Sequence, residues 1–246
     1  MSVNLKFQLA ILAILTGLVI SVPRGRAGYI EDWDTGNNQW YYYDENVGDG
    51  DVALGAVQSG GEDGGAYVEA PFDSMTEWSE IPGVWWGPYT YGDDGGSSVH
   101  PIDLNEDPVI SIYGRDETSP GNVDLKGGAV HFWIGRFYDP DGPGGPTSPL
   151  LTFFHYDDTV KITDTWSPTR QVIRSNPGRW TELVNDENLD PIDLFDEPQQ
   201  WGFGIFGASD KPTGVLGFDS LANTPEPAAA ILLLLGALLA LNRRRR

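Results

Sequence analysis

The chain has 246 residues and a formal net charge of −21 at pH 7, from 36 acidic and 15 basic residues. Binding to nucleic acid or to anionic lipid headgroups depends on cationic side chains, so this composition argues against both. Cysteine is absent, so stability comes from packing or bound ions rather than from disulfides.

The N-terminus has the layout of an export signal. Lys6 is the only charge before the apolar stretch 7–22, and the small residues Gly25 and Ala27 follow. This pattern is typical of a signal peptide, which predicts cleavage after Ala27 and a signal peptide over 1–27. An uncleaved N-terminal anchor is the alternative.

The residues between 28 and 223 alternate short aromatic-rich segments with turns of Gly, Pro, Asp and Asn, and offer no amphipathic helix of ten or more residues. Such spacing predicts an all-β fold, an antiparallel jelly-roll-like β-sandwich, as one domain. The stretch 72–98 reads as loop-like because its aromatic residues lie among Pro and Gly. Strands are expected at 29–33, 39–43, 51–58, 66–70, 109–113, 128–138, 150–156, 170–174, 179–184, 200–206 and 215–221.

Both ends of this domain carry a family resemblance. The opening segment runs Glu31-Asp-Trp-Asp34-Thr-Gly36, and the closing segments are 201–207 and 215–221, the latter containing Asp219. These segments resemble the first and last strands of jelly-roll carbohydrate-binding modules. The resemblance implies that the two strands pair and that a structural Ca²⁺ joins them.

Three carboxylates follow from that resemblance as tentative calcium ligands: Glu31, Asp34 and Asp219. Hard oxygen ligands suit Ca²⁺, and solvated turn acids are the alternative. Two further acidic loops, 44–51 and 139–142, lack the EF-hand pattern and are interpreted as ordinary turns.

Aromatic residues provide the main binding hypothesis. Exposed Trp and Tyr rings in loops can stack on the apolar faces of sugars, whereas large aromatics more often pack into a core. The candidate platform consists of Trp78, Trp85, Trp86, Tyr89 and Tyr91. The tryptophans on expected strands, Trp40, Trp133, Trp180 and Trp201, are assigned to the core.

Catalysis finds little support. The three histidines His100, His131 and His155 show no metal-ligand spacing, and there is no G-x-S-x-G motif. So many acids always supply candidate carboxylate pairs, so a pair alone indicates nothing. The chain is predicted not to be an enzyme.

The C-terminus has three features in order: a Pro-Glu-Pro tripeptide, fourteen apolar residues at 228–241, and four arginines. At about 1.5 Å per residue the apolar helix would span roughly 21 Å, which is short for a bilayer core of about 30 Å. The arginines favour a cytoplasmic end. The residues that define the pattern are Pro225, Glu226, Pro227, Arg243, Arg244, Arg245 and Arg246.

This pattern resembles the PEP-CTERM sorting tail of Gram-negative bacteria, covering 224–246. The resemblance implies export machinery and an exosortase-type processing enzyme as partners, with transient anchoring in the inner membrane. An ordinary short membrane anchor is the alternative.

Two function hypotheses follow. The first is an exported, non-catalytic protein of the cell surface or extracellular matrix that binds polysaccharide or calcium. The second is a carbohydrate-active enzyme or its sugar-binding module.

Overall fold

The computed structural model describes residues 30–34, 36, 39–47, 50–78, 81–92, 98–119, 121–138, 140, 148–196 and 198–224. The predicted signal peptide and residues 225–246 of the predicted sorting tail lie outside these ranges. Within them, no helix is long and apolar enough to cross a bilayer.

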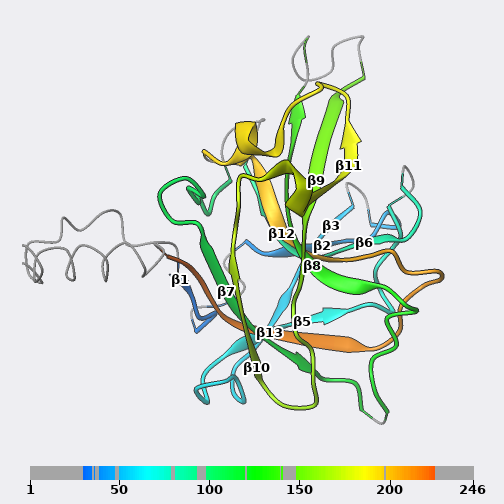
Figure 1. The fold of residues 1–246 in the computed structure, drawn as a ribbon. Coiled ribbons are helices and arrows are strands. Elements are labelled where there is room, and N and C mark those ends of the chain that lie inside the picture. Colours follow the sequence, from blue (N-terminus) through cyan, green and yellow to red (C-terminus); the bar gives the residue numbers. More distant parts are fainter. Residues whose placement is uncertain are drawn as a thin grey trace, which may run out of the picture.

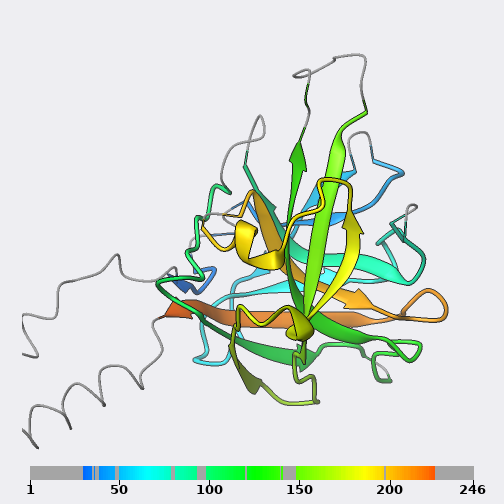
Figure 2. The same cartoon turned by 45° about the horizontal axis from the view of Figure 1, so that its top comes forward.

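Two antiparallel sheets make up the fold (Figures 1 and 2). The first sheet runs in the order β10 (Ser167–Val172), β7 (Val109–Asp116), β13 (Val215–Thr224), β5 (Tyr67–Pro71) and β4 (Gly55–Val57), with β1 (Ile30–Glu31) paired to β13. The second runs β11 (Trp180–Asn185), β9 (Leu150–Thr159), β8 (Ala129–Tyr138), β12 (Gln200–Phe206), β6 (Val84–Tyr91), β2 (Tyr41–Tyr43) and β3 (Asp51–Ala53). The helical turns in the described ranges are two short 3₁₀ segments, η2 (Pro177–Arg179) and η3 (Pro191–Leu194). The predicted all-β antiparallel sandwich is confirmed.

The main core lies between the two sheets. Phe203 of β12 and Phe218 of β13 stack with ring centroids 6.0 Å apart, and this contact joins the sheets directly. Trp40 meets Trp201 edge-on at 5.2 Å. Trp40, Trp180 and Trp201 all belong to this core, as the sequence predicted. Full burial of such large rings is the dominant stabilising contribution in a fold without disulfides.

Side chains of β8 alternate between the two faces of its sheet. Val130, Phe132 and Ile134 pack in the main core. Successive strand residues point to opposite faces, so Trp133 and Phe137 lie on the outer face of the seven-stranded sheet. The ends of β8 and β9 project beyond the rest of the sandwich (Figures 1 and 2).

The loop-like interpretation of 72–98 was wrong for β6. Val84–Tyr91 is an eight-residue strand that pairs with β12. Gly87 and Pro88, which suggested a loop, fall where the register shifts between Gly202 and Gly204. A β-bulge at this point accommodates a proline that has no N–H to donate.

Candidate functional site

A second aromatic cluster lies outside the main core, on the outer face of the seven-stranded sheet. Its buried members are contributed by β6, β8, β9, β12 and the segment before β6. They are Trp78, Val84, Trp86, Tyr89, Trp133, Phe153 and Phe206. We call this set the outer cluster.

Glycines explain how the outer cluster packs. Gly202 and Gly204 of β12 pair with Trp133 of β8 and Trp86 of β6, the strands on either side. Because glycine has no side chain, the two indoles meet with ring centroids only 4.3 Å apart. A Cβ on Gly202 would lie 2.6 Å from the Cα of Tyr89, so β6 and β12 approach too closely for a larger residue.

The same device recurs on β8. A Cβ on Gly135 would lie 2.5 Å from Cε1 of Phe153, so the phenyl ring covers this glycine. Phe153 in turn meets Trp78 edge-on, with ring centroids 5.4 Å apart. Small residues in the middle of the sheet thus let large rings from neighbouring strands lie over it.

These rings surround a hollow of about 230 Å³, which we call the aromatic hollow. Residues from β2, β3, β6, β8, β9 and β12 line it, together with Trp78. The lining consists of Tyr43, Asp51, Trp78, Trp86, Tyr89, Tyr91, Trp133, Phe137, Phe153 and Gln200.

Four of the five predicted aromatic residues line this hollow: Trp78, Trp86, Tyr89 and Tyr91. The fifth, Trp85, belongs to the main core instead. It neighbours Trp86 in a strand, so the two side chains point to opposite faces. Three of the four rings are more than nine-tenths buried, so they form walls of a hollow rather than a flat exposed platform.

Polar groups in the hollow are few and distinct. The Tyr89 hydroxyl donates a hydrogen bond to Oδ1 of Asp51. Burial and the neighbouring Asp51 raise the pKa of Tyr89 well above its usual value, which keeps the hydroxyl protonated. Trp133 is only 1 % exposed, yet its indole N–H has no hydrogen-bond partner among the described residues. A buried donor without an acceptor is costly.

Sequence reasoning missed several members of the lining. Asp51 and Gln200 were within expected strands, and Trp133 was assigned to a core. Trp133 and Phe137 are four residues apart in the expected strand 128–138, so alternation puts them on one face and could have suggested a second aromatic face. Nothing in the sequence showed which strands lie beside β8.

Two histidines extend this face. The rings of His131 on β8 and His155 on β9 lie 4.6 Å apart, and His155 stacks on Phe206 at 4.8 Å. Burial, and then the neighbouring His131, lower the pKa of His155 to about 4. Burial also lowers the pKa of His131, so both rings are neutral at physiological pH.

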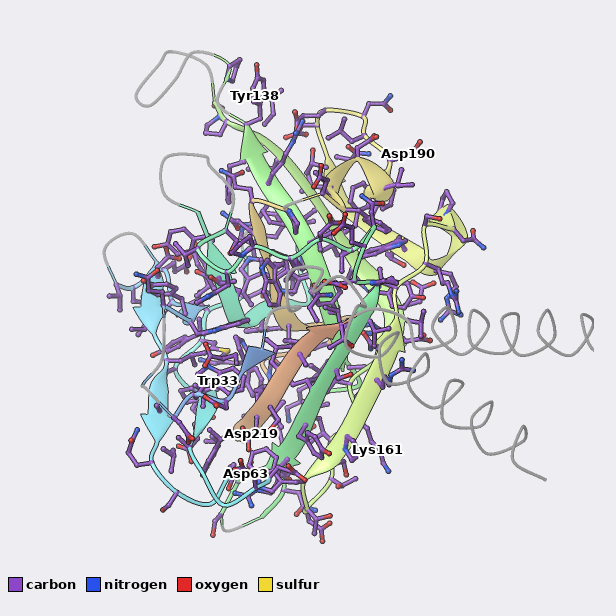
Figure 3. The ribbon with its side chains drawn as sticks, turned by 90° about the vertical axis from the view of Figure 1, so that its left-hand side faces the viewer. Trp33, Asp63, Tyr138, Lys161, Asp190 and Asp219 are labelled. Atoms are coloured by element: carbon purple, nitrogen blue, oxygen red, sulfur yellow. The ribbon has the colours of Figure 1, made fainter. Side chains whose placement is uncertain are left out.

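The acidic residues predicted to bind calcium lie where the first and last strands meet. β1 pairs with β13 through Glu31 and Leu221, as the resemblance implied. The buried Asp219 accepts hydrogen bonds from the backbone N–H groups of Glu62 at 2.5 Å and Ser220 at 2.6 Å. Asp219 lies near Asp63 (Figure 3). Burial raises the pKa of Asp219, and the adjacent acids add to this effect.

The other two candidates also accept backbone hydrogen bonds. Asp34 accepts from the N–H of Ala66 at 2.9 Å, and Glu31 accepts from the N–H of Trp33 at 2.8 Å. Across the residues that the structure describes, no three or more His, Asp or Glu side chains are grouped so that they could hold a metal ion. The calcium ion therefore stays a prediction.

The structure describes most of the acidic loop 44–51 but little of the acidic loop 139–142. Asp44 accepts a hydrogen bond from the N–H of Asn46 at 3.0 Å, the geometry of a side-chain-capped turn. In the second loop, Asp139, Asp141 and Gly142 lie outside the described residues.

Comparison with known proteins gives distant likenesses only. No protein-family model and no curated protein matches the chain. A family 11 carbohydrate-binding module from Clostridium thermocellum, in complex with a β-1,3-1,4-mixed-linked tetrasaccharide, has 11 % identity and a TM-score of 0.47, covering 81 % of this chain and 96 % of that one. The family 11 module of the cellulase Lic26A-Cel5E from the same organism has 11 % identity and a TM-score of 0.41, covering 71 % and 81 %. The L4b domain of human laminin alpha-2 has 10 % identity and a TM-score of 0.33, covering 82 % and 99 %. With identities and scores this low, nothing about the site follows from them.

Proposed function

We propose that this chain is a non-catalytic saccharide-binding protein and that a sugar occupies the aromatic hollow. The observation that carries the proposal is a hollow walled by aromatic rings, with the hydrogen-bonded pair of Tyr89 and Asp51 in its lining. Sugars present apolar C–H faces to such rings, and their hydroxyl groups exchange hydrogen bonds with polar side chains.

The volume of the aromatic hollow and the charge of its lining limit the class of ligand that it can bind. The hollow, at about 230 Å³, is smaller than the roughly 300–1,000 Å³ of sites for drug-sized molecules, so it fits one residue or one end of a glycan. Among the described residues of the lining, Asp51 is the only one with a charged side chain, and it is acidic. A like charge repels an acidic sugar, so neutral sugars are the expected class.

The enzyme alternative is less well supported. Glycoside hydrolysis uses two carboxylic acids on either side of the scissile bond. Among the described residues that line the hollow, Asp51 is the only one that supplies a carboxylate. Binding without hydrolysis is therefore the function that this lining favours.

A glycan array with the 246-residue chain, followed by titration calorimetry, tests the proposal. Trp133→Phe replaces the indole by a smaller phenyl ring and so reduces the aromatic wall, and a lost aromatic contact of about 0.5–1.5 kcal/mol weakens binding about 2- to 13-fold. Trp33→Phe is the matched control, because Trp33 also has a buried unpartnered N–H but is not in the lining. Failure of the wild-type chain to bind any neutral glycan would refute the proposal.

Export and sorting form a separate part of the proposal. We propose that the chain is exported through its N-terminal signal, sorted by the PEP-CTERM-like tail, and delivered to the cell surface or matrix. The residue pattern at 1–27 and 224–246 supports this. Mass spectrometry of the mature termini tests it, and an uncut chain in the cytosol would overturn it.

A structural calcium ion at Glu31, Asp34 and Asp219 is the last element proposed. An ion that binds the folded state must raise the melting temperature. Thermal unfolding in millimolar Ca²⁺ and in chelator provides the test. Equal melting temperatures in the two conditions would refute the calcium site.

A further inference from the structure

His131 of β8 and His155 of β9 form a pair on the outer face of the seven-stranded sheet, with ring centroids 4.6 Å apart. Neither is among the residues that line the aromatic hollow. The register between β8 and β9 shifts between His131 and Trp133, and a β-bulge of this kind re-aims the side chains beside it. The sheet therefore holds two imidazoles from adjacent strands together, at a place that the proposed function does not use.

One backbone carbonyl determines which nitrogen is protonated in both rings. The oxygen of Tyr156 lies 2.8 Å from Nδ1 of His131 and 3.4 Å from Nδ1 of His155. A carbonyl oxygen only accepts hydrogen bonds, so Nδ1 carries the proton and each neutral ring has a lone pair on Nε2. Both rings are neutral at physiological pH because burial lowers their pKa values.

The two Nε2 atoms are available to a ligand. Within the described ranges, the side-chain hydrogen bonds of His131 and His155 involve Nδ1. The buried side-chain nitrogens that lack a partner there belong to three tryptophans and one arginine, and to neither histidine. Both rings are half-buried. Two unprotonated nitrogens therefore lie close together with access to solvent.

The spacing of the two rings suits one shared metal ion. Imidazole nitrogen is a preferred ligand of Zn²⁺, Cu²⁺ and Ni²⁺. With a metal–nitrogen bond of about 2.0–2.1 Å, the ion lies roughly 3.2 Å from each ring centroid, and two ligands in neighbouring coordination positions have centroids roughly 4.5–5.2 Å apart. The observed 4.6 Å between His131 and His155 falls in this range.

The surroundings of the pair also fit a metal ion. A histidine that binds a metal usually donates its other ring N–H to a backbone carbonyl or a carboxylate, and Tyr156 supplies such an acceptor. Asp157, two residues after His155, is exposed and acts electrostatically on both imidazoles. Its negative charge favours a cation at this place. We propose that His131 and His155 form a two-imidazole site for a divalent transition-metal ion, with Cu²⁺ bound most tightly.

Two protein ligands make this a reversible site. Structural zinc sites use four protein ligands, whereas the described residues contain no group of three or more His, Asp or Glu side chains that could hold a metal. Water completes the coordination of an ion held by His131 and His155. The site is independent of the proposed saccharide binding, so neither stands or falls with the other.

Copper binding to the 246-residue chain tests the site directly, because the chain has three histidines in all. Cu²⁺ is titrated by calorimetry in excess Ca²⁺, which prefers oxygen ligands and occupies exposed carboxylates. Electron paramagnetic resonance of the equimolar complex reports how many imidazole nitrogens bind the copper. We expect one saturable site with two such nitrogens. Absence of saturable binding, or a spectrum with fewer than two imidazoles, would overturn the proposal.

Substitution of each histidine locates the site. His131→Gln and His155→Gln each remove one imidazole, and His100→Gln is the matched control because His100 stacks on Trp40 instead. Loss of a group that only supports a ligand weakens metal binding about 10–100-fold, so loss of one imidazole ligand should weaken it at least about 10-fold. His100→Gln should bind Cu²⁺ as wild type does. Wild-type affinity in His131→Gln and His155→Gln would overturn the site.

Thermal unfolding separates a lost ligand from a lost fold. A metal that binds the folded state raises the melting temperature, so Zn²⁺ should raise that of wild type and of His100→Gln. The double variant of His131→Gln and His155→Gln should melt at one temperature with and without Zn²⁺. An equal rise in the double variant would place the ion elsewhere and overturn the proposal. If the double variant does not fold, the two-nitrogen spectrum of the wild-type complex decides.

Discussion

Gly202→Ala is the sharpest test of how the aromatic hollow is built. A Cβ at this position would lie 2.6 Å from Cα and 2.7 Å from Cβ of Tyr89, and closer still to the carbonyl oxygen of Pro88. Two of these three atoms are main chain, so no rotamer change relieves the contact and β6 must separate from β12. Overpacking of a core costs about 1–3 kcal/mol, and we expect the upper end, about 3 kcal/mol.

That cost translates into a measurable shift. For a chain of this size, 1 kcal/mol changes the melting temperature by roughly 2–4 °C, so Gly202→Ala should melt about 6–12 °C below wild type. Thermal unfolding followed by far-UV circular dichroism measures this. Because β6 carries Trp86 and Tyr89 of the hollow wall, the same variant should also lose glycan affinity.

Gly55→Ala is the matched control. Gly55 lies in β4, and nothing lies within 4 Å of where its Cβ would be. An alanine there should leave the stability unchanged or raise it by about 0.4–1 kcal/mol. If Gly202→Ala melts within about 2 °C of wild type, the close approach of β6 and β12 is not the reason for glycine at this position.

Three further predictions concern the same sheet. Gly135→Ala should push the ring of Phe153 off β8 and cost about 1–3 kcal/mol in denaturant unfolding; an unchanged midpoint would contradict this. The pKa of His155 is lowered to about 4 by burial and by His131, so the unfolded chain takes up a proton at higher pH than the folded one. Stability should therefore fall as pH drops from about 6.5 towards 4, by about 1–2 kcal/mol after allowance for partial exposure, and His155→Gln should flatten that part of the curve. Glu187→Gln breaks a two-bond ion pair with an arginine of β8, with bonds of 2.6 and 2.5 Å, and should cost about 1–2 kcal/mol, while equal denaturation midpoints would show that the pair contributes nothing.

Alternation made much of the sandwich predictable. In 128–138 the residues Val130, Phe132 and Ile134 share a face in the sequence and lie together in the main core. Trp40, Trp180 and Trp201 were correctly assigned to the main core, whereas Trp133, on the opposite face of 128–138, is buried in the outer cluster. These are local properties, and the sequence contains them directly.

β6 shows where local reasoning fails. Its Gly87 and Pro88 are loop-forming residues, and only the register shift opposite them on β12 makes a strand possible. Because the segment read as a loop, Trp85 and Trp86 appeared equivalent. A strand gives them opposite faces, so one lines the aromatic hollow and the other joins the main core.

Which residues line the aromatic hollow depends on the order of the strands in the sheet, and local sequence patterns do not show that order. Asp51, Trp133 and Gln200 meet because β3, β8 and β12 belong to one sheet in a particular order. Sequence separation between these residues is large, so their contact is a consequence of the whole topology. The candidate aromatics were found because they are neighbours in the chain, and their polar partners were missed because they are not.

The segment 201–207 alternates large apolar residues with glycines, and this pattern is informative apart from any family resemblance. Trp201, Phe203 and Ile205 alternate with Gly202 and Gly204, so one face of β12 is large and the other is bare. A central strand with a bare outer face is destabilised unless rings from its neighbours cover it, and here Trp86 and Trp133 do so from both sides. Alternating large residues and glycines in a central strand therefore predict an aromatic surface contributed by the adjacent strands.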